Sequence, residues 1–357
     1  MFSSYSAFRL GVDEHQQVLD ELGIITLPKP IMEMSLREIR EYFGYDTTNG
    51  IKKTLLMRNL IWQLFNQIQA GNPPDFYKKQ GFIRGMWYYI KKKFSNHHPL
   101  RGDMYNLMSS QLTLMVRKGL FSYADFNFRD RDADSWKLGF DNPHIILVAE
   151  KDGFITIMED LHRRYGCHTI TCGGVPSFMT VNYMVEAMQR YGIDMEQEFF
   201  ILTFCDFDPS GYNIAEELVK HLQSSGLKNV HLFDQWGQGR KRRPWLELAV
   251  PENFNDSAKD FRYRLPRSTW DNPTTVDWVK LTGGLDGPKW KKGRPTHGLE
   301  SDEFDFDLIL SLFDQKLQPL LESPSDDIIQ RNALQELRQE FEQMAIVKFL
   351  QRLQGQT

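Results

Sequence analysis

The sequence predicts an α/β protein in which helical segments precede a buried parallel sheet. Three short apolar runs, rich in β-branched and aromatic residues, begin at Ile145, His168 and Phe199. Each run ends at a glycine or polar turn and is followed by a helical pattern, which is the signature of βαβ units. The chain has 357 residues, of which 41% are hydrophobic and 25% charged, enough for two or three domains with their own cores.

Residues 1 to 75 form the first predicted region, which is helical. Ser35 followed by Glu38 fits a capping box at the start of one helix. This region could serve as a dimerisation or docking arm, or simply cover the next domain. The clearest segments with apolar residues at helical spacing read VLDELGI, SLREIREYFGY and TLLMRNLIWQLFNQI.

Residues 76 to 135 follow the order helix, turn, helix and short strands, which predicts a winged-helix domain. The segment 82–94 is amphipathic, Asp103 is placed to cap a second helix, and Gly119 ends that helix. The segment 120–128 alternates as a hairpin wing would. The second helix would then lie in or near a DNA groove.

Basic residues of this domain could contact DNA phosphates. They could equally be a solvated helix face, and many winged-helix domains bind proteins instead. The residues concerned are Lys91, Lys92, Lys93, Arg101, Arg117 and Lys118.

Residues 136 to 357 form the third predicted domain, which contains the parallel sheet and a C-terminal helical extension. The polar segment 129–143, rich in turn formers, is expected to link it to the preceding domain. Two helices and one further strand are predicted after the first strands, in the segments VNYMVEAMQRYG, YNIAEELVKHLQSSG and KNVHLFDQW.

Three acidic residues follow predicted strands of this sheet: Glu150 after the first, Asp206 and Asp208 after the third. In an open parallel sheet the ligand crevice lies at the carboxyl ends of the strands. Asp206 and Asp208 are two apart in an extended segment, so they could share one cation, and Glu150 could complete the group. Hard oxygen ligands suit Mg²⁺. The alternative is that Asp208 only caps the helix that starts at Pro209.

The ordered segments AEKDGF, TCGGVPS and CDFDPSG resemble a Toprim domain, a Rossmann-like parallel sheet. They resemble in particular the version of this domain in the A subunit of topoisomerase VI and its meiotic double-strand-break relative. The resemblance implies that Glu150, Asp206 and Asp208 hold Mg²⁺. Toprim domains also occur in primases and nucleases, so the domain alone does not fix the reaction.

The same family has its nucleophilic tyrosine in a winged-helix domain, after an arginine, two variable residues and an aromatic residue. That pattern runs here from Arg84 through Gly85 and Trp87 to Tyr88, so the resemblance assigns the nucleophile to Tyr88. A shift of one residue would select Tyr89. The family usually has an acidic residue where this chain has Gly85.

A phenol, with its ordinary pKa near 10, needs a nearby cation or base to act as a nucleophile at neutral pH. Arg84 is one helical turn from Tyr88 on the same face, and could lower the phenol pKa or contact the phosphate. The alternative is that Trp87, Tyr88 and Tyr89 are core aromatic residues.

The segment between Trp236 and Gly298 contains two basic tracts, 240–243 and 289–294, with tryptophans interleaved. They suit the wall of a groove that follows a phosphate backbone, or are solvated loops. Glu300 could be an additional acid near the metal, or an acidic helix start. The amphipathic tail 323–354 could pack as a terminal helix or join a dimer.

Composition limits the kinds of partner. The net charge is −4, so DNA binding has to depend on local basic patches. Cys167, Cys172 and Cys205 form no C-x-x-C pair and are expected in the core of a protein from a reducing compartment. The sequence has no run of 18 apolar residues and no signal-peptide pattern, so a soluble, intracellular protein is expected.

The resemblance implies a Mg²⁺-dependent transesterase that acts as a homodimer on double-stranded DNA and leaves a 5′-phosphotyrosyl link. No G-x-x-x-x-G-K-[ST] sequence occurs, so ATP would act only through a separate B-type ATPase subunit, as in a topoisomerase. A dedicated double-strand-break former is the close variant. The alternatives are a Toprim metallonuclease that uses activated water, and a non-catalytic DNA-binding subunit.

Overall fold

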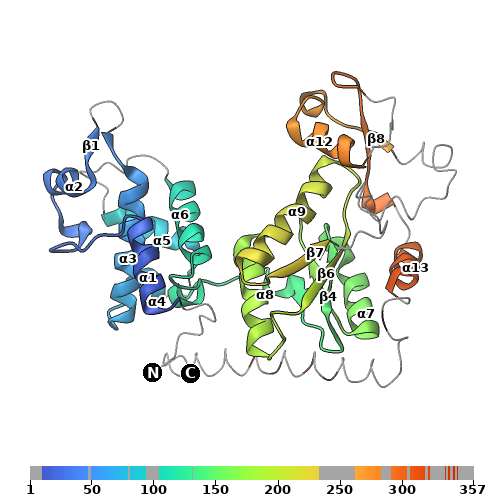
Figure 1. Cartoon of the computed structure of the whole chain (residues 1–357), viewed down its shortest axis with the longest axis horizontal. Helices are drawn as coiled ribbons and strands as arrows, with labels where there is room; N and C mark the ends of the chain where they lie inside the picture. Colours follow the sequence, from blue (N-terminus) through green and yellow to red (C-terminus); the bar gives the residue numbers. More distant parts are fainter. Residues whose placement is uncertain are drawn as a thin grey trace. The chain divides into compact units, whose positions relative to one another are not determined.

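The chain divides into two compact units, Met1–Arg131 and Asp132–Thr357, which are described separately (Figure 1). The structure is a computed structural model. It describes residues 10–46, 50–78, 81–93, 104–130, 132–232, 262–282, 291–303 and 306–317, with residues 321, 334, 337, 341 and 344.

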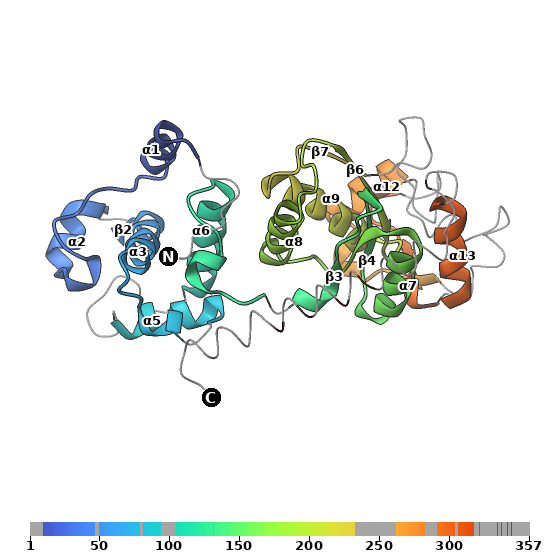
Figure 2. The ribbon, with the colours of Figure 1, turned by 90° about the horizontal axis from the view of Figure 1, so that it is seen from below.

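The first unit is built mainly of helices, as the apolar spacing predicts. Helix α3 lies between α2 and α6 (Figure 2), and it buries Leu56, Met57, Leu60 and Leu64. The short strands β1 (Tyr45–Asp46) and β2 (Gly50–Ile51) pair antiparallel. The helices are α1 (Val12–Glu21), α2 (Leu36–Phe43), α3 (Lys53–Gln69), α4 (Asp75–Lys78), α5 (Ile83–Lys93) and α6 (Tyr105–Arg117).

The predicted capping box at the start of α2 is confirmed. The Ser35 hydroxyl accepts from the Glu38 backbone N–H at 3.3 Å, and the Glu38 carboxylate accepts from the Ser35 N–H at 2.7 Å. Two backbone donors that the helix leaves free are therefore satisfied.

The predicted hairpin wing after α6 is wrong. The segment instead forms a 3₁₀ turn, η2 (Ala124–Phe126), with Asn127 in the left-handed region at φ 54°. Asp125 accepts from the Ser122 N–H at 2.8 Å, and the Ser122 hydroxyl accepts from the Asp125 N–H at 3.3 Å. This reciprocal pair closes a local turn, which competes with strand pairing. Buried aromatic side chains, not a strand face, explain the alternation of the sequence.

The second unit contains the predicted α/β sheet, in the strand order β3-β5-β4-β6-β7. Strands β4 (Asn142–Ala149), β5 (Cys167–Thr171), β6 (Glu198–Phe204) and β7 (Asn229–Leu232) are parallel. Strand β3 (Trp136–Lys137) pairs antiparallel with β5. The two units divide within the predicted linker 129–143, but β3 and the start of β4 (Asn142) also lie in that segment, so most of it belongs to the second unit.

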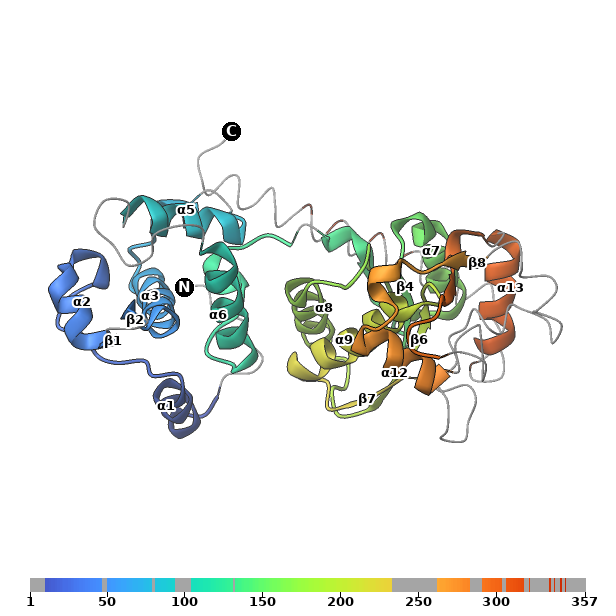
Figure 3. The same cartoon turned by 90° about the horizontal axis from the view of Figure 1, so that it is seen from above.

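Helices cover both faces of this sheet. In Figures 2 and 3, α7 (Ile155–Tyr165) and α13 (Phe306–Leu317) lie on one side, and α8 (Phe178–Arg190) and α9 (Pro209–Ser224) on the other. Phe204 of β6 and Phe313 of α13 pack with ring centroids 5.9 Å apart. The C-terminal extension therefore completes the hydrophobic core on the α7 side.

An antiparallel pair, β8 (Arg262–Arg264) and β9 (His297–Leu299), joins the extension to the sheet. Phe207 and Leu299 exchange backbone hydrogen bonds of 2.9 and 3.2 Å just beyond β6. Helix α12 (Pro273–Thr282) contacts α9. This connection brings the residues after β9 to the carboxyl end of the sheet.

Several sequence predictions lie outside the described residues, namely Arg101, Asp103, the basic tract 240–243, and most of the tail 323–354. Of the tract 289–294, Lys291, Lys292 and Arg294 are exposed. The four described tail residues Leu334, Leu337, Phe341 and Met344 are helical and exposed. Among the described residues, no helix has the length and apolar character needed to cross a membrane.

Candidate active site

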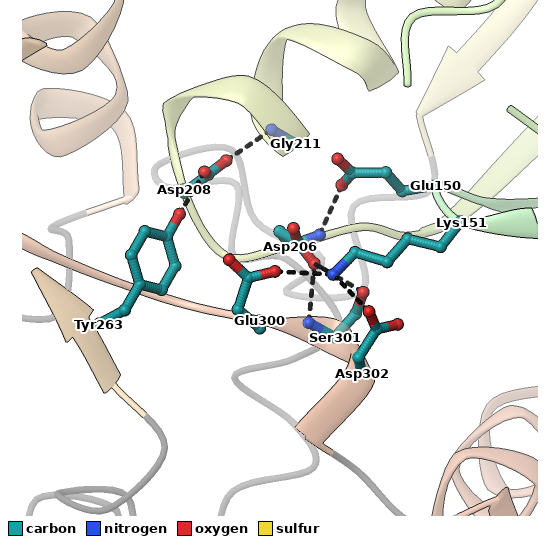
Figure 4. A network of polar contacts seen from close by, with 9 residues as sticks. All are labelled: Glu150, Lys151, Asp206, Asp208, Gly211, Tyr263, Glu300, Ser301 and Asp302. Atoms are coloured by element: carbon teal, nitrogen blue, oxygen red, sulfur yellow. Dashed lines mark hydrogen bonds and ion pairs between the residues drawn. The ribbon is translucent and has the colours of Figure 1, made fainter. Parts of the chain in front are cut away.

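The structure brings the three predicted acidic residues to one end of the sheet. Ala149 and Phe204 are partners in the register of β4 and β6, so Glu150 and Asp206 follow the two strand ends side by side. Glu150, Asp206 and Asp208 are 9%, 7% and 9% exposed. The Asp206 N–H donates to Glu150 Oε2 at 2.8 Å, which links the two strand ends (Figure 4).

Asp208 caps α9, as the alternative interpretation of this residue predicts. Its Oδ1 accepts from the Gly211 N–H at 2.7 Å, and Pro209 occupies the first helical position. Its Oδ2 accepts from the Tyr263 hydroxyl of β8. Both oxygens of Asp208 therefore have protein donors.

The close approach of α9 to the segment before it explains why this turn ends in a glycine, Gly211. A Cβ atom at Gly211 would lie 2.1 Å from the carbonyl oxygen of Asp206, a distance at which atoms overlap. The absence of a side chain lets the first turn of α9 rest directly on the segment that carries Asp206 and Asp208. The glycine that ends the D-P-S-G sequence is thus required by the packing of α9 against the segment from Asp206 to Asp208.

The residues that complete the network follow β9. The Ser301 N–H and hydroxyl both donate to Asp206 Oδ1, at 2.7 and 2.6 Å. Lys151 contacts three carboxylates: Asp206 at 3.2 Å, Glu300 at 2.6 Å and Asp302 at 3.0 Å. We call Lys151, Asp206, Glu300, Ser301 and Asp302 the lysine network.

Of this network, the sequence prediction included Asp206 and, as one alternative, Glu300. Lys151 directly follows Glu150 in the segment AEKDGF, so the sequence itself indicates that Lys151 lies near the acidic residues. Ser301 and Tyr263 carry no local signal, because they lie 95 and 55 residues from their partners Asp206 and Asp208.

Burial and charge set the protonation of these groups. Burial, with the negative charges of Asp206 and Asp208, raises the pKa of Glu150 to about 7. Burial alone would lower the pKa of the Lys151 ammonium. The hydrogen bonds to Glu300 and Asp302 have a larger effect in the opposite direction, so the pKa is raised. Burial and the bond to Asp208 also raise the pKa of Tyr263, which keeps it a neutral donor.

The donor chemistry of the site suits a hard divalent cation, but Glu150, Asp206 and Asp208 do not converge on one point. Within the described ranges, no group of three or more His, Cys, Asp or Glu residues could hold a metal ion. Asp206 is held by Ser301 and Lys151, and Asp208 by Gly211 and Tyr263. Mg²⁺ commonly binds through one or two carboxylates together with waters and substrate phosphate, so it does not require three protein ligands.

Tyr88 and Arg84 lie in the other unit, on helix α5. Tyr88 is 59% exposed, whereas the preceding Trp87 is 2% exposed, so the core-aromatic interpretation holds for Trp87 and not for Tyr88. The Arg84 guanidinium lies over the ring of Tyr105, 5.0 Å from its centroid. The exposed phenol of Tyr88 is accessible to a macromolecular substrate.

Tyr89, the neighbouring candidate, has a different environment. Its half-buried ring packs against Phe76 at 5.5 Å between centroids, and the Lys93 ammonium lies 5.9 Å from the ring centroid. Burial and the charge of Asp75 raise the pKa of Tyr89, which disfavours the phenolate. Of the two candidate tyrosines, Tyr88 is therefore the more accessible.

The sequence matches no model of a known protein family and no curated protein. The function is therefore inferred from the residues and their arrangement.

Proposed function

We propose that this protein is a Mg²⁺-dependent DNA transesterase of the topoisomerase VI A-subunit type. The observation that supports the proposal most strongly is the joining of Glu150 and Asp206 at adjacent strand ends, with Asp208 two residues on (Figure 4). Residues 136–357 would be the Toprim domain, residues 76–135 a tyrosine-bearing helical domain in which a 3₁₀ turn replaces the predicted wing, and residues 1–75 a helical region before it.

In the proposed reaction the phenol oxygen of Tyr88 forms a bond to the phosphorus of a DNA backbone phosphate. The bond from phosphorus to the 3′ oxygen breaks, and the leaving oxygen takes up a proton as the phenol loses one. The products are a 5′-phosphotyrosyl link and a 3′-hydroxyl, and the reverse reaction reseals the strand. Exposure of Tyr88 and Arg84 on α5 is compatible with contact to a phosphate.

Glu150, Asp206 and Asp208 are the residues that would hold Mg²⁺, which, when bound, neutralises charge on the phosphate. In the structure, Asp206 also accepts from the Ser301 hydroxyl and forms an ion pair with Lys151. The site therefore combines negative oxygens for a cation with a lysine that can approach an anion.

Double-stranded DNA is the proposed substrate, and cutting both strands would require a homodimer. The exposed side chains of Lys91, Lys92 and Lys93 at the end of α5 are suitable phosphate contacts near the nucleophile. Strand passage would in addition require a separate B-type ATPase subunit. Without such a partner, the proposed chemistry is limited to cleavage and resealing.

The test is a search for covalent protein–DNA adducts. Purified protein is incubated with Mg²⁺ or Mn²⁺ and supercoiled DNA, quenched with detergent, and analysed before and after protease treatment. Adducts on 5′ ends that disappear in Tyr88→Phe and persist in Tyr89→Phe are expected. The half-buried Tyr89 makes Tyr89→Phe a matched control for loss of one hydroxyl on the same helix.

A metallonuclease is the second candidate, and the environment of Glu150 favours it. A carboxylate whose pKa lies at about 7 is suited to act as a general base on water at neutral pH. Hydrolysis would give free 5′-phosphate ends that persist in both tyrosine variants. That result would exclude the transesterase and retain the acidic site as the catalytic centre.

A further inference from the structure

The ammonium of Lys151 is enclosed by carboxylate oxygens from three separate residues (Figure 4). Its distances to Asp206 Oδ1, Glu300 Oε2 and Asp302 Oδ2 are 3.2, 2.6 and 3.0 Å. The side chain of Lys151 is 23% exposed. A lysine ammonium has three donors, so these three contacts use its full capacity.

The same oxygen of Asp206 serves several donors. Asp206 Oδ1 accepts from the Ser301 N–H and hydroxyl and contacts Lys151. A divalent cation on this oxygen would stand beside the Lys151 ammonium, and two like charges at such a distance repel strongly. Lys151 and a divalent cation therefore compete for Asp206.

We propose that the Lys151 ammonium takes the place of the divalent cation in the metal-free protein and must leave Asp206 before the cation binds. The inference rests on the metal site of the proposed function. It also accounts for the failure of the acidic residues to converge, because the lysine network draws Asp206 toward Glu300 and Asp302.

The backbone around Lys151 is fixed by hydrogen bonds, whereas its side chain is a flexible stem with rotatable bonds. Glu150 is held by a backbone hydrogen bond of 3.1 Å to Phe204, and Ala149 by one of 2.9 Å from Cys172. The four-carbon stem of Lys151 can thus carry the ammonium away while the strand end stays in place. A DNA phosphate offers the departing ammonium a new anionic partner.

Substrate and metal should then bind cooperatively. If Lys151 occupies the site in most molecules, the apparent metal affinity falls in proportion to the fraction of protein that is competent to bind. DNA that attracts Lys151 raises that fraction. By linkage, the metal must strengthen DNA binding by the same factor.

The experiment measures Mn²⁺ binding to the full chain by electron paramagnetic resonance, with and without a short DNA duplex. The variants are Lys151→Met, which removes the ammonium, and Asp206→Asn, which keeps an oxygen acceptor for Ser301. Lys280→Met is the matched control, because Lys280 is 68% exposed and its 3.2 Å ion pair with Asp277 is on the surface. Thermal unfolding of each variant checks that it is folded.

In the absence of DNA, Lys151→Met should bind Mn²⁺ about tenfold more tightly than the wild type, as expected if Lys151 occupies the site in about nine molecules of ten. DNA should strengthen Mn²⁺ binding to the wild type and to Lys280→Met by a larger factor than to Lys151→Met, in which DNA phosphate adds a ligand but has no ammonium to draw away. Lys151→Gln should behave like Lys151→Met, and replaces it if the methionine variant does not fold.

Unchanged or weaker Mn²⁺ binding by both Lys151 variants would overturn the inference and leave the proposed function intact, provided that the wild type binds Mn²⁺ and Asp206→Asn does not. Absence of Mn²⁺ binding in every folded variant would overturn both the inference and the metal dependence of the proposed function. The two failures are thereby distinguished.

Discussion

The carboxyl end of the sheet, which holds Glu150, Asp206 and Asp208 and is called the acidic end below, differs from helix α5, the tyrosine helix with Tyr88. The two differ in how many protein groups hold their candidate functional residues. Every carboxylate of the predicted triad has a protein donor, and the surrounding groups come from β4, β6, β8 and the segment after β9. On α5, by contrast, Tyr88 is exposed, and within the described residues its hydroxyl has no hydrogen bond.

This difference indicates which half of the proposed site depends on another molecule. The acidic residues are held in place by hydrogen bonds within their own unit. The phenol of Tyr88 lacks such support, and DNA or a second protomer would have to supply it. The second protomer of the proposed homodimer could supply that support.

At the acidic end of the sheet, Gly211→Ala is expected to reduce the free energy of unfolding most. The new methyl group would lie 2.1 Å from the Asp206 carbonyl oxygen, so α9 or the acidic turn must shift. We expect a loss of about 3 kcal/mol in the free energy of unfolding, measured by urea denaturation. Adduct formation should be lost even where the variant remains folded, because both aspartates follow the shifted backbone.

An unchanged unfolding free energy for Gly211→Ala would contradict the close approach between α9 and Asp206. It would also indicate that the acidic end of the sheet can adjust to an added side chain.

A pH-dependent effect concerns the acid stability of the sheet unit. His168 of β5 is fully buried, and its Nδ1 accepts from the Gly139 N–H at 2.9 Å, so protonation of Nδ1 would break this bond. Burial lowers the pKa of His168 to about 3. The unfolded chain takes up this proton below about pH 6.5, so stability is full above that pH and falls by about 1.4 kcal/mol per pH unit toward pH 3.

Urea denaturation at several pH values tests this slope. His168→Asn, whose amide oxygen can accept from Gly139, should lose less stability than the wild type between pH 6.5 and 4.5. His231→Asn is the control, since the side chain of His231 is 52% exposed. Equal slopes for wild type and His168→Asn would contradict a neutral, buried His168.

The smallest effect is expected on the tyrosine helix, where the same substitution has the opposite sign. A Cβ atom at Gly85 meets nothing within 4 Å, so Gly85→Ala should add about 0.5–1 kcal/mol to the unfolding free energy. Urea denaturation beside Gly211→Ala measures both. Destabilisation by Gly85→Ala would reveal packing against α5 and would contradict its open surroundings.

The sequence predicts the central strands and the acidic residues because both depend on local patterns. Buried parallel strands read as continuous apolar runs, and residues after such runs fall at the ligand edge. The positions of Glu150 and Asp206 after such runs are therefore enough to identify them as candidate site residues. The helix cap by Asp208 was also expressed locally, in the sequence from Asp208 to Gly211.

Other features have no such local signal. Strand β3 has only two residues, and the turn at Ser122 and Asp125 overrides an alternating pattern that resembles a strand. Tyr263 and Ser301 reach the acidic end only because β9 pairs with the chain beyond β6. Pairing across such sequence distances depends on the whole fold, so no periodicity of the sequence reveals it.

The link between Phe207 and Leu299 also has a consequence for the order in which the site is completed during synthesis. A ribosome releases Asp206 long before Ser301, which follows 95 residues later. Until then Asp206 lacks both of its Ser301 donors, and Lys151 lacks Glu300 and Asp302. Under the proposed function, nascent chains and fragments that end before β9 would carry the acidic residues without a finished DNA-cutting centre.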